Sequence, residues 1–261
     1  MQGRVVPKTL ERLQVFPDQW EKEFRVMEEI GFTHVELLDD KENGLRDTLQ
    51  KKKKEFFYGL TKSGLQCSSV CADQLCNYSL LKNPVEFKNR IDDLLQTLEG
   101  CGTYIVVIPF FDENKIDSSE ELKGALKELA LYDGILQARG FRFAIEALLP
   151  AADIIQAMEE FSFTSIGVCY DIGNSIGNDF NVTEEIKMLR NMLVHVHVKD
   201  RLNGKNVRLG ANPQKLSAAF GALRDMQYKG LCILETQITP DPLEEAHINF
   251  KTTEKYIKEH I

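Results

Sequence analysis

The residues of this sequence best suited to chemistry are three carboxylates and a histidine, carried by four separate apolar runs. Each run is short enough to be a buried strand, and the residues are Glu146, Asp171, His197 and Glu235. Three carboxylates held close together repel one another unless a cation neutralises them. Three oxygen donors and one imidazole suit Mn²⁺, Mg²⁺ or Co²⁺, and leave positions open for substrate oxygens. A fold that gathered these residues would make a divalent-metal site.

The strand around His197 supports this interpretation. A single acidic residue at a strand end is more often a helix cap or an ion-pair partner than a ligand, but four such residues in one chain favour the metal site. Valines alternate along residues 194–198 on one face, while His195, His197 and Lys199 share the other. His195 lies one layer deeper than His197. We therefore expect it to be hydrogen-bonded in the core or behind the metal ligand.

Apolar runs alternate with helix-like segments along the chain, which predicts an α/β fold with a parallel sheet. One helix is expected over Ser118–Arg139, capped by Ser118 and closed by Gly140. Seven strands are expected, each followed by a helix. They cover residues 33–38, 65–72, 103–109, 141–146, 164–171, 192–199 and 231–235.

An eighth strand is needed to close a barrel, and only Met1–Val6, a short segment that contains Gly3, can supply it. An open doubly wound sheet is the alternative, but that fold has a Gly-rich phosphate loop after its first strand, and none is present. No linker-like stretch divides the chain. We therefore predict a single (β/α)8 TIM barrel domain over residues 1–261, with the four residues at the C-terminal ends of neighbouring strands, where such barrels have their active sites.

The composition limits the partners of the protein. The chain has 261 residues and a net charge of −8, which argues against a nucleic-acid partner because phosphate binding needs excess Lys and Arg. No apolar run approaches the ~18 residues of a membrane span, and no signal-like segment follows the polar start. We expect a cytoplasmic protein with no membrane contact. The six cysteines form no CxxC pair, which favours buried apolar side chains over zinc ligands.

The motifs around these residues resemble those of the sugar isomerase/epimerase superfamily with a xylose isomerase-like barrel. The Asp-Ile-Gly-Asn and His-Val-Lys-Asp-Arg forms are most similar to the pentulose-5-phosphate 3-epimerase branch. The likeness spans nearly the whole chain, and its motifs specify the superfamily better than the substrate. They are Ala144-Ile145-Glu146, Tyr170-Asp171-Ile172-Gly173-Asn174, His195-Val196-His197-Val198-Lys199-Asp200 and Ile233-Leu234-Glu235.

The resemblance implies an isomerase with one divalent ion, usually Mn²⁺, with Mg²⁺ or Co²⁺ as alternatives. Its ligands would be Glu146, Asp171, His197 and Glu235, and the two glutamates would also be the catalytic acid/base residues. A cation that bridges a carbonyl and a neighbouring hydroxyl stabilises an enediolate. Two glutamates on opposite faces can then remove a proton from one side and return it on the other. The expected reaction is epimerisation or aldose–ketose isomerisation of a sugar or sugar phosphate, and a homodimer is a further family expectation.

Five residues are expected to bind the substrate. Arg201 and Lys199 follow the seventh strand and Arg4 ends the first, so they could bind a phosphate or sugar hydroxyls; a solvated basic loop is the alternative. Asn174 could hydrogen-bond a sugar hydroxyl. Glu36, at the end of the second strand, would either contact substrate or pair with Arg4.

The sequence also departs from its relatives. Many ketose epimerases have a histidine where this chain has Asn174, which is a poorer metal ligand. The further histidines of endonuclease IV, a distant relative, are replaced by Cys71-Ala72-Asp73, Pro109-Phe110 and Asn206-Val207, so a trinuclear zinc site is not expected. The Leu-Gly-Glu-Gly common after the seventh strand reads Leu209-Gly210-Ala211-Asn212.

Two other functions remain open from the sequence. A dehydratase of the inosose dehydratase type would use the same site and enediolate and then expel hydroxide. A non-catalytic barrel would bind sugar without converting it. Exchange of solvent deuterium into a ketose separates catalysis from binding, and loss of water identifies a lyase.

Overall fold

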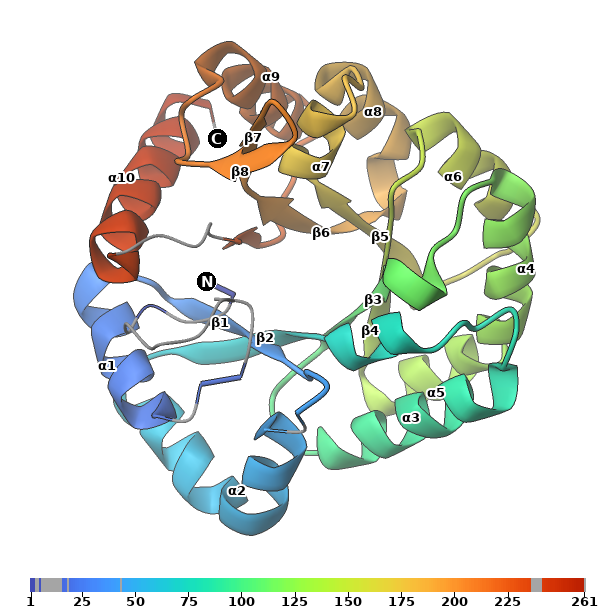
Figure 1. Ribbon diagram of the computed structural model, residues 1–261, viewed down its shortest axis with the longest axis horizontal. Helices are drawn as coiled ribbons and strands as arrows, with labels where there is room; N and C mark the ends of the chain where they lie inside the picture. Colours follow the sequence, from blue (N-terminus) through green and yellow to red (C-terminus); the bar gives the residue numbers. More distant parts are fainter. Residues whose placement is uncertain (3–4, 6–15, 18, 43, 236–240, 261) are drawn as a thin grey trace.

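The computed structural model describes residues 1–2, 5, 16–17, 19–42, 44–235 and 241–260. Arg4, one of the residues expected to bind substrate, lies outside these ranges. Within them, no helix has both the length and the apolar character needed to cross a membrane. The described chain forms a ring of helices around a ring of strands (Figure 1).

Seven parallel strands form the wall of the barrel, in the order β1-β2-β3-β4-β5-β6-β9. Each lies within one of the seven predicted segments or extends one residue beyond it. The strands have near-continuous apolar sequences because both of their faces are buried: helices cover the outer face, and side chains fill the inner one. The strands are β1 (His34–Leu38), β2 (Gln66–Cys71), β3 (Ile105–Phe110), β4 (Arg142–Ala147), β5 (Ile166–Asp171), β6 (Leu193–Val198) and β9 (Cys232–Leu234).

Gln2 closes the gap between β1 and β9. It forms isolated parallel bridges with Glu36 on one side and with Glu235 on the other. Its backbone N–H donates to the Leu234 carbonyl at 2.9 Å, and the Glu36 N–H donates to the Met1 carbonyl at 2.9 Å. The fold is therefore a TIM barrel, and the predicted strand at Met1–Val6 contributes a single described bridging residue.

The outer helices follow the strands in alternation, with one correction to the sequence analysis. The helix predicted over Ser118–Arg139 is divided into two, although Ala130 and Leu131 at the junction keep helical backbone angles. The α-helices are α1 (Trp20–Ile30), α2 (Gly44–Lys62), α3 (Pro84–Thr97), α4 (Ser119–Leu129), α5 (Tyr132–Arg139), α6 (Ala151–Met158), α7 (Ile172–Gly177), α8 (Val182–Leu189), α9 (Pro213–Asp225) and α10 (Pro242–His260). Short 3-10 helices cover Asp73–Asn77, Asp112–Asn114 and Arg190–Met192.

The apolar core has two parts. The larger part lies between the strands and the helices and contains most of the buried aromatic rings. The smaller part is a cluster of modest side chains separate from it: Leu38, Cys71, Ile105, Val107, Ala144 and Cys169. Its members come from β1 to β5, on the alternate positions that face into the barrel.

The segment after β6 is a hairpin, where the sequence analysis expected a basic loop. Strands β7 (Asp200–Leu202) and β8 (Lys205–Val207) pair antiparallel. Asn203 and Gly204 join them with positive φ values of 52° and 75°, which is the backbone of the Asn-Gly turn common in two-residue hairpins. The hairpin lies beside α7 at the C-terminal end of the strands (Figure 1).

Candidate metal centre

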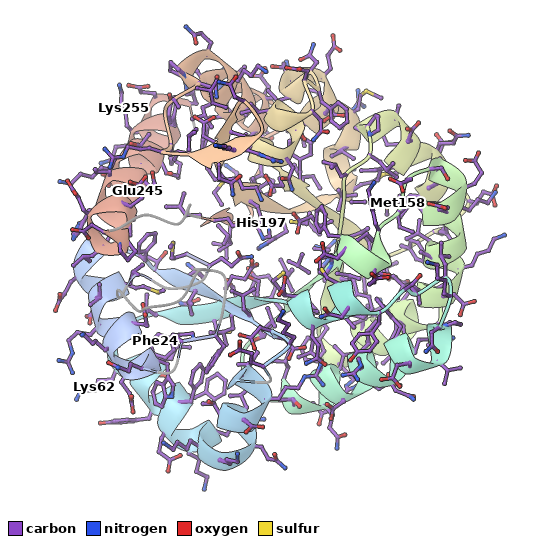
Figure 2. The ribbon with its side chains drawn as sticks, viewed as in Figure 1. Phe24, Lys62, Met158, His197, Glu245 and Lys255 are labelled. Atoms are coloured by element: carbon purple, nitrogen blue, oxygen red, sulfur yellow. The ribbon has the colours of Figure 1, made fainter. Side chains whose placement is uncertain are left out.

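The barrel brings the four predicted metal ligands together at the C-terminal ends of neighbouring strands. Glu146 and His197 are near the ends of β4 and β6, Asp171 ends β5, and Glu235 directly follows β9. Asp171 and His197 are direct partners in the β5–β6 register. One ligand atom from each of the four lies within 4.8 Å of the others. His197 lies near the centre of the ring of helices (Figure 2).

The His197 ring has one nitrogen whose surroundings fit a metal ion. Its Nδ1 atom lies 3.6 Å from Glu146 Oε2 and 3.6 Å from Glu235 Oε2. The side chain is fully buried, and Nδ1 has no hydrogen-bond partner among the described residues. Buried polar atoms normally have a partner. A divalent ion between this nitrogen and the two carboxylates would satisfy it, so the residues present fit such an ion.

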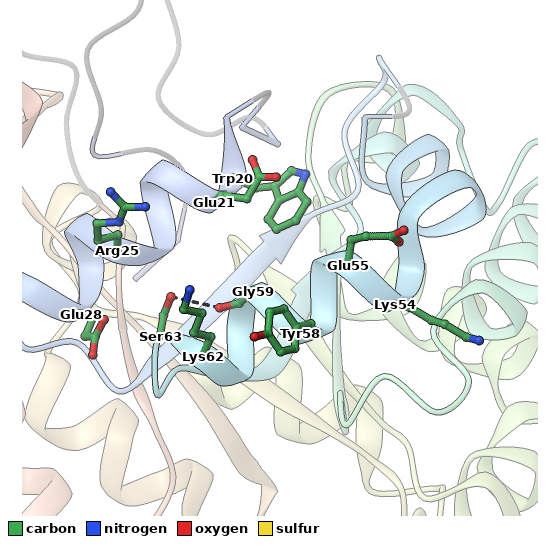
Figure 3. Close-up of a pocket in the computed structure, with 10 residues that line it drawn as sticks. All are labelled: Trp20, Glu21, Arg25, Glu28, Lys54, Glu55, Tyr58, Gly59, Lys62 and Ser63. Atoms are coloured by element: carbon green, nitrogen blue, oxygen red, sulfur yellow. Dashed lines mark hydrogen bonds between the residues drawn. The ribbon is translucent and has the colours of Figure 1, made fainter.

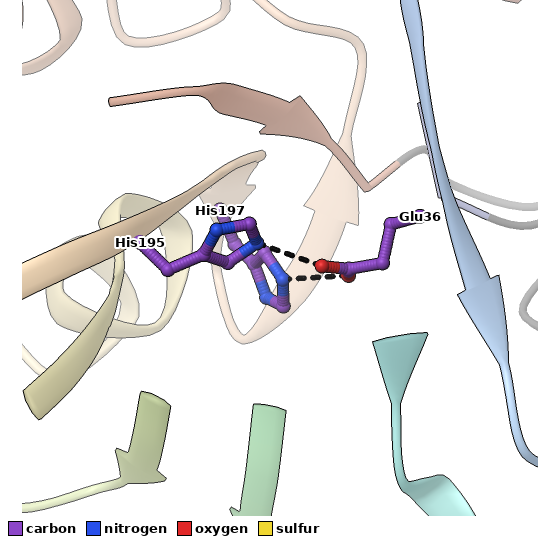
Figure 4. A group of neighbouring side chains, drawn as sticks. All are labelled: Glu36, His195 and His197. Carbon is purple, nitrogen blue, oxygen red and sulfur yellow. Dashed lines mark hydrogen bonds and ion pairs between the residues drawn. The ribbon is translucent and has the colours of Figure 1, made fainter. Parts of the chain in front are cut away.

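Glu36 holds the other nitrogen of His197. Nε2 of His197 donates to Glu36 Oε1 at 2.8 Å, and Nε2 of His195 donates to Glu36 Oε2 at 2.7 Å. Figure 4 shows the two rings, both from β6, directed at the carboxylate from β1. Gln2 Nε2 donates to the same Oε1 at 2.8 Å. A carboxylate behind a histidine fixes its orientation and leaves Nδ1 free for a metal.

The pKa values follow from this crowding. Burial raises the pKa of Glu36, but the two imidazoles outweigh it and hold that pKa well below its usual value. Burial lowers the pKa of His197, yet Cys169, Glu36 and Glu146 bring it well above the usual value. For Asp171, burial dominates and the pKa rises to about 6, despite the nearby Lys199 ammonium. Without a metal the site therefore holds protons that an ion would replace.

Glu146 differs from Asp171 although it lies in the same cluster. Its pKa is lowered: burial raises it, and His197 and Lys199 lower it by more. The ionised form of Glu146 is therefore the favoured one.

Lys199 lies inside the cluster rather than at its rim. Its Nζ is 2.6 Å from Asp171 Oδ2 and 3.0 Å from Glu235 Oε1, and its side chain is 9% exposed. Burial lowers the pKa of Lys199, but Asp171 and Glu235 raise it above its ordinary range. Lys199, which was expected to bind substrate, thus has its ammonium in contact with two of the predicted ligands.

Glu36, which was expected to contact substrate or pair with Arg4, contacts two histidines. Glu36 is 1% exposed, and both carboxylate oxygens accept hydrogen bonds from histidines. It lies behind His197, where it positions the ring and cannot reach a substrate without breaking these bonds.

Asn174 and Arg201 lie at the edge of the cluster and remain suitable for substrate contact. Asn174, in α7, has its Nδ2 3.4 Å from Glu146 Oε1, and its backbone N–H donates to Asp171 Oδ1 at 2.9 Å. Arg201, in the hairpin, approaches Asn174 Oδ1 at 3.4 Å and donates to the Gly204 carbonyl at 2.9 Å. Both side chains are partly exposed.

Two residues that lie beside the predicted ligands were not identified from the sequence. Cys169 has its sulfur within 4.8 Å of ligand atoms of Glu146 and His197. The signal was its position two residues before Asp171 on one strand, which places both side chains on the same face. Gln2 was missed because its contact with Glu36 depends on closure of the barrel, which no local pattern indicates.

A hollow between α1 and α2 lies away from this centre (Figure 3). Trp20 and Arg25 line it from α1, and Tyr58 and Lys62 line it from α2. Opposite charges are mixed along its wall, and it includes none of the four predicted ligands. The chemistry of the molecule is therefore best sought at the strand ends.

The chain belongs to the xylose isomerase-like TIM barrel family, whose sequence profile matches residues 24–255. Among curated protein sequences, none matches this chain. Solved structures show the same fold. The 3-keto-D-glucoside 4-epimerase of E. coli is similar with a TM-score of 0.73 and 18% identity, over 93% of this chain and 95% of that one.

Two further structures are similar over most of their length. A xylose isomerase-like TIM barrel protein from Mycobacterium smegmatis, in complex with magnesium, has a TM-score of 0.72 and 17% identity, covering 92% of this chain and 88% of that one. The D-psicose 3-epimerase of Clostridium cellulolyticum H10, with D-tagatose, has a TM-score of 0.73 and 14% identity, covering 94% and 96%. At these identities the likeness establishes the fold.

Proposed function

We propose that this protein is a divalent-metal-dependent sugar isomerase or epimerase that moves a proton next to a carbonyl group. The observation that carries the proposal is the position of Glu146 and Glu235, whose Oε2 atoms each lie 3.6 Å from His197 Nδ1. Two carboxylates beside one cation position are the groups that a two-base proton transfer uses. Similar folds include sugar epimerases and a magnesium complex, which agrees with this chemistry.

The proposed ligands are Glu146, Asp171, His197 and Glu235. Oxygen donors with one imidazole suit Mn²⁺, Mg²⁺ or Co²⁺, and of these the resemblance to the sugar isomerases implies Mn²⁺. When bound, the ion would neutralise negative charge that develops on the carbonyl oxygen as the neighbouring proton leaves.

Glu146 and Glu235 divide the proton transfer. One carboxylate removes the proton from the carbon beside the carbonyl, and the other returns a proton from the opposite side, which inverts that carbon. Return to the neighbouring carbon would instead exchange aldose and ketose. The ionised state of Glu146, favoured by His197 and Lys199 through its lowered pKa, suits it to begin as the base.

Asn174 and Arg201 would bind the substrate beside these groups. Asn174 can donate to a sugar hydroxyl while it stays next to Glu146, and Arg201 can bind a hydroxyl or a phosphate oxygen. The substrate class is a sugar or sugar phosphate.

The test is exchange of solvent deuterium into ketoses and ketose phosphates in the presence of Mn²⁺, followed by NMR. Deuterium at the carbon beside the carbonyl, with an epimeric or isomeric product, is the expected result. Exchange accompanied by loss of water would instead assign a dehydratase. Sugar binding without exchange at any position would contradict an enzyme of this kind.

A further inference from the structure

Lys199 places a permanent positive charge inside the acidic cluster. Its ammonium lies between Asp171 Oδ2 at 2.6 Å and Glu235 Oε1 at 3.0 Å, and only 9% of the side chain is exposed. A buried ammonium keeps its charge when carboxylates surround it. The cluster therefore already contains one cation before any metal arrives.

Glu235 divides its two oxygens between two cation positions. Oε2 faces His197 Nδ1 at 3.6 Å, on the side where Glu146 also lies, whereas Oε1 contacts the Lys199 ammonium at 3.0 Å. The first position has a ring nitrogen with no hydrogen bond to any described residue, and it fits a metal. The second is filled by the side chain of Lys199.

Gly173 provides the space for this arrangement. A Cβ atom added at Gly173 would lie 2.3 Å from Lys199 Cγ and 2.9 Å from the Lys199 carbonyl oxygen. Atoms do not approach this closely, so only glycine allows the lysine stem to pass at this point. The glycine lies in the first turn of α7, directly after Asp171 and Ile172. The local chain is thus shaped around the lysine.

One divalent ion and Lys199 together would match the charge of the three carboxylate ligands. Glu146, Asp171 and Glu235 carry three negative charges when ionised, a divalent ion would supply two positive charges, and Lys199 supplies the third. Repulsion between Lys199 and the bound ion grows with the charge of the ion.

We propose that the Lys199 ammonium acts as a fixed positive charge within the proposed metal centre. This charge limits the affinity of the centre for metal ions and favours divalent over trivalent ions. The inference rests on the proposed metal centre, but it assigns Lys199 a role separate from substrate binding. If Lys199 only stabilised the fold, its replacement would weaken the binding of all metal ions to a similar extent. If Lys199 acts through its charge, its replacement would strengthen the binding of metal ions, and that of a trivalent ion most.

The experiment measures binding of Mn²⁺ and of Tb³⁺ to metal-free protein by calorimetry and terbium luminescence. It compares wild type with Lys199→Met, which removes the charge, and Lys199→Gln, which keeps an amide that can donate to the carboxylates. Lys88→Met is the matched control, because it removes a partly buried lysine that pairs with Glu128 at 2.8 Å on the outer helices. Circular dichroism verifies that each variant is folded.

Both Lys199 variants should bind Mn²⁺ at least about tenfold more tightly than wild type, since a positive charge near the ion is removed. The affinity for Tb³⁺ should increase by a larger factor than the affinity for Mn²⁺, and Lys88→Met should leave both affinities unchanged. Unchanged or weaker binding by the two folded Lys199 variants, with a wild type that binds Mn²⁺, would overturn the role of Lys199 alone. No Mn²⁺ binding by any of the proteins would overturn the proposed metal centre as well.

Discussion

The two sides of the His197 ring differ in how well their polar atoms are satisfied. On the β1 side, Nε2 donates to Glu36 at 2.8 Å, and Glu36 also binds His195 and Gln2. On the side of Glu146 and Glu235, the open side, Nδ1 has no hydrogen-bond partner within the described part of the chain and lies 3.6 Å from each of these two carboxylates. One nitrogen of the ring is thus hydrogen-bonded to a carboxylate, and the other is not.

This difference separates the residues that hold the site from those that act in it. Both oxygens of Glu36 are buried and accept hydrogen bonds, so this carboxylate holds the ring with no help from a ligand. The carboxylates on the open side need a cation, and Lys199 supplies only part of the charge. Substitutions on the open side should therefore abolish activity and leave the barrel folded. Substitutions at Glu36, behind the ring, should weaken metal binding.

The largest effect should come from the two glutamates on the open side. Glu146→Gln and Glu235→Gln should each lower the turnover number by about 10²–10⁴-fold or more, because the amide cannot exchange the proton. Steady-state rates on an active ketose, with circular dichroism as a check on folding, measure this. Near-normal turnover in either variant would show that the two-base scheme is wrong.

A smaller loss is expected behind the ring. Glu36→Gln offers one acceptor oxygen where two histidines need one each, so Mn²⁺ affinity should fall by about 10–100-fold. Titration of the metal-free protein measures it. Glu185→Gln is the matched control, since Glu185 is a buried carboxylate that accepts from Ala151 N and the Tyr170 hydroxyl. Equal Mn²⁺ affinity in Glu36→Gln and wild type would mean that Glu36 does not position His197.

Crowding near Lys199 should reduce stability. Gly173→Ala places a Cβ 2.3 Å from Lys199 Cγ, so the free energy of unfolding should fall by about 1–3 kcal/mol. Urea unfolding compares it with Gly221→Ala in α9, where nothing lies within 4 Å of the added atom and helix propensity favours alanine. If the two variants were equally stable, the space at Gly173 would not be required.

The smallest effect is expected at the rim. Asn174→Ala should raise KM about fivefold, the value of one hydrogen bond of about 1 kcal/mol, and should leave the metal content unchanged. Kinetics and elemental analysis on the same preparation separate the two readouts. Loss of metal equal to the loss of substrate affinity would place Asn174 among the ligands instead.

The fold could be predicted because apolar strands and helices alternate, and four of the strands end at or beside a carboxylate or a histidine. The grouping of Glu146, Asp171, His197 and Glu235 followed from the rule that barrel strands share one C-terminal end. These predictions needed only local patterns and one general property of the fold.

The contacts of Glu36 and Lys199 could not be predicted in this way. Glu36 is 159 residues from His195, and only closure of the barrel determines which side chains of β1 and β6 meet. For Lys199, the alternation along the strand correctly placed the side chain on the same face as His197. Its contact with Asp171 depends on the space beside Gly173, which no local pattern indicates. The hairpin at Asn203 and Gly204, in contrast, had a clear local signal that the sequence analysis did not use.

The most direct test of the metal centre is the metal content of purified, undialysed protein, compared with Asp171→Ala and Glu235→Ala. The account predicts about one divalent ion per chain, of manganese, magnesium or cobalt, and its loss from both folded variants. A wild-type protein that binds no ion even after Mn²⁺ is added would contradict it, because the open side of His197 would then be stable without a metal.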